Sequence, residues 1–189
     1  MSSVTDRLFA TDEDPDLIVA RSKERRDQSN AQAIERWRAW LAQHHEATLA
    51  LSLDELERRH DFIQWWFPIG AKSPINPDAP VIGRHAMRDA VQADPELAAA
   101  MRRSFHRFLQ VLGLALEGGQ VREVNAPVVR WIDRATHTDR RLSRALRSMH
   151  NAGLHDETRA LMAFLELEMK DRPARWDALR WWRHQLVDA

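Results

Sequence analysis

The sequence predicts an all-α protein, an irregular single-domain bundle of about eight helices with a Pro-rich loop packed on the second helix. Three observations lead to this prediction. Apolar residues recur every three or four positions along most of the chain, which is the spacing of a buried helical stripe. No stretch alternates for long enough to form a sheet, and no repeat of fixed period is present. The 189 residues, 44% of them apolar, suit one packed core.

The chain changes character near residue 28. Residues 1–28 are polar, with an acidic cluster followed by basic residues, and we expect this segment to be only partly ordered. Residues 29–189 form the predicted helical domain. Its first helix is expected from about residue 30 to residue 44, because Ile34, Trp37 and Leu41 follow the helical step there.

The second helix is predicted from its capping residues. Ser52 and Glu55 form an S-x-x-E capping box directly before an apolar run, so a helix should begin there and continue to Phe67. The prolines that follow each remove a backbone donor and restrict the residue before them, which favours a defined loop with extended and turn conformations. This loop carries Pro68, Pro74, Pro77 and Pro80.

Further helices are predicted downstream. Asp94 followed by Pro95 is typical of a helix start, and Thr136 with Asp139 forms a second capping box. The Gly-Gly pair at 118–119 indicates a turn. The predicted helices cover residues 84–92, 95–113, 126–134, 136–151 and 156–170, and a final segment from residue 173.

The composition excludes several classes of function. The 28 basic and 28 acidic side chains balance, so no overall field attracts nucleic acid or an anionic membrane. The absence of cysteine excludes disulfides, thiolate metal sites and a cysteine nucleophile. No apolar run is long enough to cross a bilayer and no secretion signal is visible. We therefore expect a soluble, cytoplasmic protein without a transmembrane segment or a cofactor.

Two segments carry the most specific signal. Residues 60–82 read HDFIQWWFPIGAKSPINPDAPVI, and residues 136–154 read THTDRRLSRALRSMHNAGL. The first resembles the signature of the opioid growth factor receptor conserved-domain family, in which an IQW-x-FP run precedes an NPDAP-like segment. The second resembles a later segment of the same family. The arginine-rich, lysine-poor composition indicates a bacterial source. Because the resemblance spans most of the chain, we expect a bacterial member that consists of the conserved domain only.

The resemblance implies the family's fold and a surface for a ligand or partner, without an established catalytic activity. Vertebrate members are described as receptors for the short opioid peptide Met-enkephalin, associated with the nuclear periphery. At the level of single residues, the resemblance extends to His60, Ile63, Gln64, Trp65, Phe67, Pro68, Asn76, Pro77, His137, Arg141 and Arg144.

The last turn of the predicted second helix indicates an enclosed niche. This turn is apolar on nearly all sides, so the Pro-rich loop should fold back over it. His60 and Gln64 would then lie in apolar surroundings, where each polar group needs a hydrogen-bond partner. Two interpretations remain open: loop carbonyls and neighbouring side chains supply the partners, or both residues project into a cleft and meet a ligand.

The second segment supplies a basic stripe. On a regular helix from residue 136, one narrow face carries His137, Arg141, Arg144 and Ser148. This face is either a solvated exterior or an arginine-lined site for an anion or carboxylate. We predict that Arg141 and Arg144 border the same depression as Gln64 and Trp65. The candidate ligand-binding residues are His60, Gln64, Trp65, Asn76, His137, Arg141 and Arg144.

An enzymatic function is the main alternative. The dipeptides His60-Asp61 and His155-Asp156 are of the kind used by HD-type metal-dependent phosphohydrolases, in which a divalent metal activates water. The set would be completed by His44 or His137 and by Asp171 or Asp177. Glu57 and His60 also form an E-x-x-H step, but no second step is present, so we expect Glu57 to be a solvated carboxylate.

Nucleic acid binding would require a local basic patch. Arginines that face solvent on amphipathic helices explain the same residues without a ligand, and the neutral net charge disfavours nucleic acid as a partner. The arginines concerned are Arg102, Arg103, Arg107, Arg140, Arg144 and Arg147.

The sequence thus favours a binding or interaction module that is not an enzyme and holds no metal. Its partner is an unidentified small ligand, peptide or protein. The HD-type phosphohydrolase is the alternative function, and tryptophans left on the surface could form a homodimer.

Overall fold

The computed structural model describes residues 15–127, 131–133 and 135–187. Within these residues the chain forms eight α-helices and one small antiparallel sheet, so the prediction of a mostly helical single domain is confirmed. The helices are α1 Pro15–Leu49, α2 Leu53–Arg58, α3 Ile63–Trp66, α4 Arg84–Ala93, α5 Pro95–Val111, α6 His137–Asn151, α7 His155–Met169 and α8 Trp176–His184. The strands are β1 Leu114–Glu117 and β2 Gln120–Glu123, and a short 3-10 turn, Pro173–Arg175, precedes α8.

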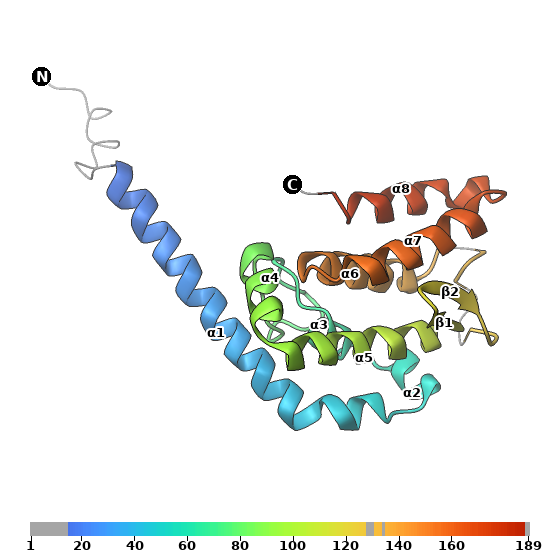
Figure 1. Cartoon of the computed structure of the whole chain (residues 1–189), viewed down its shortest axis with the longest axis horizontal. Helices are drawn as coiled ribbons and strands as arrows, with labels where there is room; N and C mark the ends of the chain where they lie inside the picture. The colour runs from blue at the N-terminus through green and yellow to red at the C-terminus, as the bar shows by residue number, and fades with distance from the viewer. Residues whose placement is uncertain (1–14, 128–130, 134, 188–189) are drawn as a thin grey trace, which may run out of the picture.

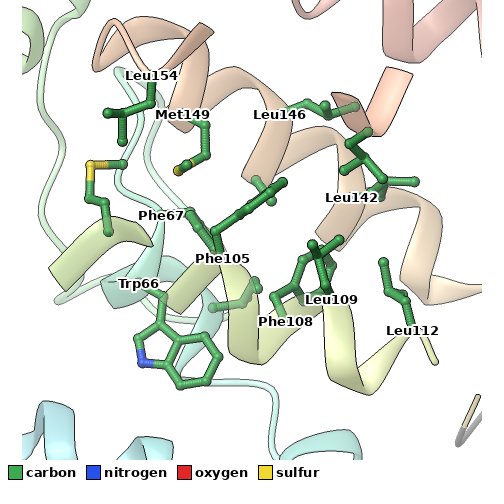
Figure 2. Packing of buried hydrophobic residues seen from close by; sticks show 14 of the residues in the cluster. Trp66, Phe67, Phe105, Phe108, Leu109, Leu112, Leu142, Leu146, Met149 and Leu154 are labelled. Atoms are coloured by element: carbon green, nitrogen blue, oxygen red, sulfur yellow. The ribbon is translucent and has the colours of Figure 1, made fainter. Parts of the chain in front are cut away.

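Helix α5 lies at the centre of the bundle and contacts α1, α2, α3 and α4 (Figure 1). Helix α6 contacts α3, α4, α7 and α8. Figure 2 shows the core between α5 and α6, where Phe67 and Phe105 meet Met149. The ring centroids of Phe67 and Phe108 are 5.8 Å apart. Because Phe67 directly follows α3, the residues 60–82 are anchored in the middle of the core.

Helix α1 is longer than the sequence analysis predicts. It begins at Pro15, crosses residue 28 without a break and ends at Leu49. Its described side chains before residue 30 are exposed, and Ala33 is the first buried one. This first half projects away from the bundle (Figure 1). The predicted stripe is therefore the packed half of a longer helix, and residues 1–14 lie outside the described range.

The second helix is interrupted, contrary to the prediction. Ser52 and Glu55 form the capping box as expected, but α2 ends at Arg58 and α3 begins only at Ile63. The residues between them, 59–62, are not helical and are called the α2–α3 link below. His60 and Gln64 therefore do not share one helical face.

A side chain from α6 explains this interruption. In a continuous helix, the carbonyls of Glu57 and Arg59 would accept hydrogen bonds from N–H groups four residues further on. Both carbonyls accept instead from Nη2 of Arg141, at 3.2 Å and 3.0 Å. A contact between residues more than 80 positions apart thus replaces the local hydrogen bonds at this point.

The β1–β2 hairpin corrects the prediction that no sheet is present. The strands have four residues each and are joined by the expected glycine turn, in which both glycines have positive φ. Only Leu114 and Val121 are buried in the two strands. Such short strands contain too little alternation to be recognised in the sequence.

The predicted helix over residues 126–134 falls partly outside the described residues. The described parts, 126–127 and 131–133, are not helical. Trp131 is buried there, and its Nε1 donates to the carbonyl O of Leu112 at 3.1 Å. The apolar residue at position 131 is therefore explained by the packing of this tryptophan in the core and not by a helical turn.

The remaining helices agree with the prediction in type and approximate bounds. Asp94 caps α5 by accepting from the N–H groups of Glu96 and Leu97. Thr136 caps α6, but Asp139 does not complete a capping box. The two carboxylate oxygens of Asp139 accept instead from Arg175, at 2.6 Å and 3.0 Å. This buried pair joins the start of α6 to the turn before α8.

We predict that Gly113→Ala destabilises the protein far more than Gly118→Ala. Both glycines have positive φ, but a Cβ at Gly113 would lie 2.3 Å from the carbonyl O of Asn125, whereas a Cβ at Gly118 meets nothing within 4 Å. The expected losses of unfolding free energy in urea are about 1 kcal/mol for Gly118→Ala and at least twice that for Gly113→Ala. Equal losses would contradict the close approach at Gly113.

We also predict that His45 makes stability depend on pH. His45 is 2% exposed, and burial, with the charge of Arg103 in support, lowers its pKa to about 4. Between pH about 6.5 and 4 the unfolded chain binds a proton that the folded protein does not, so stability is constant above this window and falls as the pH drops through it. From pH 7 to pH 5 the loss attributable to His45 should be about 1 to 2 kcal/mol.

Urea titrations of wild type and His45→Gln at both pH values measure this contribution. The glutamine variant should lose less stability on acidification, because it has no imidazole to protonate. An identical loss in both proteins would show that other groups cause the pH dependence.

Candidate functional site

A cavity of about 280 Å³ lies between the α2–α3 link, the Pro-rich loop and α6. Four of the described residues that line it carry a permanent positive charge and none carries a carboxylate. The lining residues are His60, Ile63, Gln64, Ile69, Ala71, Lys72, Ser73, Pro74, Ile75, His137, Arg140, Arg141 and Arg144. We call this space the basic cavity.

Arg141 holds the wall of the basic cavity together. Its side chain is 7% exposed, and Nη1 donates to Oε2 of Glu57 at 2.6 Å. Arg141 also donates to Nδ1 of His60 at 2.8 Å, in addition to its hydrogen bonds to the two carbonyls at the end of α2. Its guanidinium lies over the ring of Phe62. Burial lowers the pKa of Arg141, an effect that Glu57 opposes. The positive charge of Arg141 is thus neutralised inside the protein.

Glu57 is a second member of this network, in contrast to the solvated carboxylate that the sequence analysis expects. Its side chain is only 12% exposed. Oε2 pairs with Arg141, and Oε1 accepts from Nε2 of His137 at the start of α6. Glu57 itself does not line the basic cavity. It therefore compensates Arg141 without contributing a negative charge to the cavity surface.

Arg144 lies one turn further along α6 and is in a different situation. It is half-buried, and its polar contact among the described residues is a 3.4 Å hydrogen bond to the carbonyl O of Phe67. Burial lowers its pKa to about 10, so the guanidinium stays positively charged at pH 7. Arg140 and Lys72 are exposed lining residues at the rim. The cavity therefore contains a partly desolvated cation with no carboxylate partner.

The apolar part of the cavity comes from the Pro-rich loop, residues 68–82. Ile82 N donates to Ile69 O at 3.2 Å, which closes the two ends of the loop on each other. The middle is held by Asn76, whose Nδ2 donates to Asp61 O in the α2–α3 link at 2.9 Å. Ile75 is 64% exposed at the cavity edge. The loop packs on the interrupted second helix and presents isoleucines beside the cations.

The structure brings together five of the seven candidate residues. His60, Gln64, His137, Arg141 and Arg144 all line the basic cavity, as expected from a meeting of the two segments. Gln64 is 4% exposed, but His60 and His137 are exposed, so the expectation of an enclosed His60 is wrong. The interruption of the helix accounts for this, because it turns His60 outward on the α2–α3 link.

Trp65 and Asn76 have other positions. Asn76 holds the Pro-rich loop and does not line the cavity. Trp65 lines a different hollow of about 360 Å³ between α1 and the α2–α3 link. Its ring stacks on Trp40, with centroids 5.3 Å apart and planes at 8°. The predicted proximity of Trp65 to the two arginines is therefore wrong.

Sequence reasoning missed several lining residues. Lys72, Arg140 and the isoleucines of the Pro-rich loop form part of the cavity. Lys72 is one of only three lysines and stands between two prolines, which could have served as a signal. Nothing in the sequence marks the isoleucines in this way, because the fold of the loop determines which of its side chains line the cavity.

Several residues on which the nucleic-acid and phosphohydrolase alternatives depend are paired with other side chains. Arg102 pairs with Glu157 and Arg103 with Glu46, so these arginines of α5 are compensated by acids. Asp61 pairs with Arg59, and Asp156 pairs with Arg159. Across the described ranges no three His, Asp or Glu side chains are grouped in a way that could hold a metal ion. None of the described helices combines the length and the hydrophobicity that a membrane crossing requires.

The fold and the site together define the class of protein. It is a mostly helical single domain in which a Pro-rich loop and one face of α6 enclose a basic cavity. The chain belongs to the family of the opioid growth factor receptor (OGFr) conserved region, whose family model matches residues 41–186. The matched range contains every lining residue of the basic cavity. No curated protein and no solved structure matches the chain.

We predict that Arg141→Ala lowers the free energy of unfolding by about 3 kcal/mol, because removing one member of a buried ion pair leaves the other uncompensated. Arg140→Ala is the matched control: its side chain is exposed, and the change should stay within about 0.5 kcal/mol. Urea denaturation measures both. Small losses in both variants would contradict the structural role of Arg141.

Proposed function

We propose that the chain is a non-catalytic binding module whose basic cavity takes a small organic anion with an apolar body. The observation that carries the proposal is Arg144, a half-buried cation without a carboxylate partner in a cavity whose described lining contains no acid. An anion bound there would compensate the desolvation of the guanidinium, and a carboxylate or phosphate fits its planar donor pattern.

The cations around Arg144 support the same proposal. Arg140 and Lys72 have exposed side chains on the cavity rim, where they attract an anion before it reaches Arg144. The net charge of the chain is zero, so this attraction is local to the cavity. Arg141 contributes little of it, since Glu57 neutralises its charge.

The size and the walls of the cavity limit the ligand. At about 280 Å³ the cavity lies at the lower end of pockets that hold small molecules. Ile63, Ile69 and Ile75 offer apolar contacts next to the cations. A short branched carbon chain that ends in a carboxylate is small enough for this volume, and it offers an apolar body to the isoleucines and a negative charge to the cations. The family's name points to a signalling receptor, and an acidic group of a peptide is one form in which such an anion would arrive.

The surroundings of the titratable residues support a role without catalysis. His60 accepts from Arg141, and His137 donates to Glu57, so both imidazoles are already engaged in the network that holds the α2–α3 link. The described lining supplies no carboxylate as a general base. These contacts favour binding over the phosphohydrolase alternative.

We predict that Arg144→Ala weakens binding of 4-methylpentanoate, a branched carboxylate, by at least about ten-fold, because a charge-assisted hydrogen bond is lost. Titration followed by ¹H–¹⁵N NMR measures the affinity. Arg147→Ala on the same helix, whose side chain does not line the cavity, is the matched control and should bind as wild type does.

The neutral amide of the same acid, 4-methylpentanamide, tests the need for the negative charge. It should bind much more weakly than the carboxylate, and added salt should weaken only the carboxylate. Unchanged carboxylate binding by Arg144→Ala, or equal binding of the amide, would overturn the proposed function.

A further inference from the structure

We infer that the basic cavity selects a doubly charged anionic group, of the kind that a phosphate monoester carries, over a singly charged one. This inference rests on the proposed function and narrows the class of ligand. It follows from the number of cations on the cavity lining that have no acid partner.

Three of the four permanent cations on the described lining are left without a carboxylate. The charge of Arg141 is compensated by Glu57. Among the described residues, no acid pairs with Lys72 or Arg140, and neither side chain forms a hydrogen bond. The polar contact of Arg144 is to a backbone carbonyl. A singly charged ligand would compensate only one of these three charges, whereas a dianion compensates two.

The three cations come from two walls of the cavity. Arg140 and Arg144 are four residues apart on α6, so their side chains are neighbours on the surface of that helix. Lys72 belongs to the Pro-rich loop, which forms another wall. Like charges at this helical spacing repel each other, and a dianion bound beside them would offset that repulsion.

The cations on the rim contribute without touching the ligand. At physiological ionic strength, attraction between opposite charges extends over about 8 Å. A cavity of about 280 Å³ is small enough that the side chains lining it act on its interior within this range. The second negative charge of a ligand is therefore attracted by Lys72 and Arg140 in whichever direction their side chains extend.

Two neutral polar residues of the lining are engaged within the protein. With its amide nitrogen turned to the α2–α3 link, Gln64 donates to the carbonyl O of His60 and of Asp61, each at 3.1 Å. Oγ of Ser73 accepts from the backbone N–H groups of the two residues that follow Pro74, each at 3.3 Å. Charge is thus the main property by which this cavity distinguishes ligands of similar shape.

Two probes of the same shape test this inference: 3-methylbutyl phosphate and 3-methylbutyl sulfate. Both present three terminal oxygens on the same branched chain. At pH 8 the phosphate carries close to two negative charges, whereas the sulfate carries one. We expect wild-type protein to bind the phosphate at least about ten-fold more tightly, measured by ¹H–¹⁵N NMR titration.

The variant Lys72→Gln removes one cation from the rim, and Lys170→Gln is its matched control. Both lysines are exposed, but only Lys72 lines the cavity, so the two variants lose the same net charge at different places. Lys72→Gln should lower the ratio of phosphate to sulfate affinity about three-fold, and Arg140→Ala should do the same. Lys170→Gln should keep the ratio of wild type.

Equal binding of the phosphate and the sulfate by wild type would overturn the inference and leave the proposed function intact. A preference that Lys72→Gln and Arg140→Ala leave unchanged would also overturn it, because the better acceptor strength of the phosphate would then explain the preference. If neither probe binds and 4-methylpentanoate does not bind either, the inference and the proposed function both fail.

Discussion

The buried ion pair between Arg141 and Glu57 is the constraint on which the site depends. A guanidinium with 7% of its surface exposed has lost most of its hydration, and that loss is offset only if every donor finds a partner. The carboxylate of Glu57 and the two carbonyls at the end of α2 provide these partners. In doing so they prevent α2 from continuing. The need of buried Arg141 for hydrogen-bond partners therefore determines the path of the α2–α3 link and the way in which His60 and Gln64 face the cavity.

The same pair explains why the cavity is basic in a chain without net charge. Arg175, the other buried arginine among the described residues, is matched by Asp139. At the cavity wall, Glu57 from α2 pairs with Arg141 of α6. Arg144, one turn away, receives only a carbonyl oxygen. The excess of positive charge at the cavity therefore arises because Glu57 pairs with Arg141 and not with Arg144. The composition of the chain alone does not show this.

Local signals in the sequence were sufficient for most of the fold. The capping box at Ser52, the Asp94 cap and the apolar spacing of α5, α6 and α7 were recognisable because each depends on residues within a few positions of one another. The meeting of the two segments was also predicted, and five candidate residues line one cavity. The interruption between α2 and α3 was not predictable in this way, since it is caused by a side chain about 80 residues further along. That single error also led to the expectation of an enclosed His60, which is exposed.

Most of the polar residues in and around the basic cavity have one of two roles. Arg141 and Gln64 are buried and hold the backbone of the α2–α3 link, and Ser148 holds the start of the Pro-rich loop through a 2.7 Å hydrogen bond to Pro68 O. Lys72 and Arg140 have exposed side chains. If the proposed function holds, a change in the first group would alter folding and binding together, whereas a change in the second would alter anion binding with little effect on stability. Arg144 belongs to neither group: among the described residues its polar contact is one long hydrogen bond to the carbonyl O of Phe67, and this is why the proposed function places the anion there.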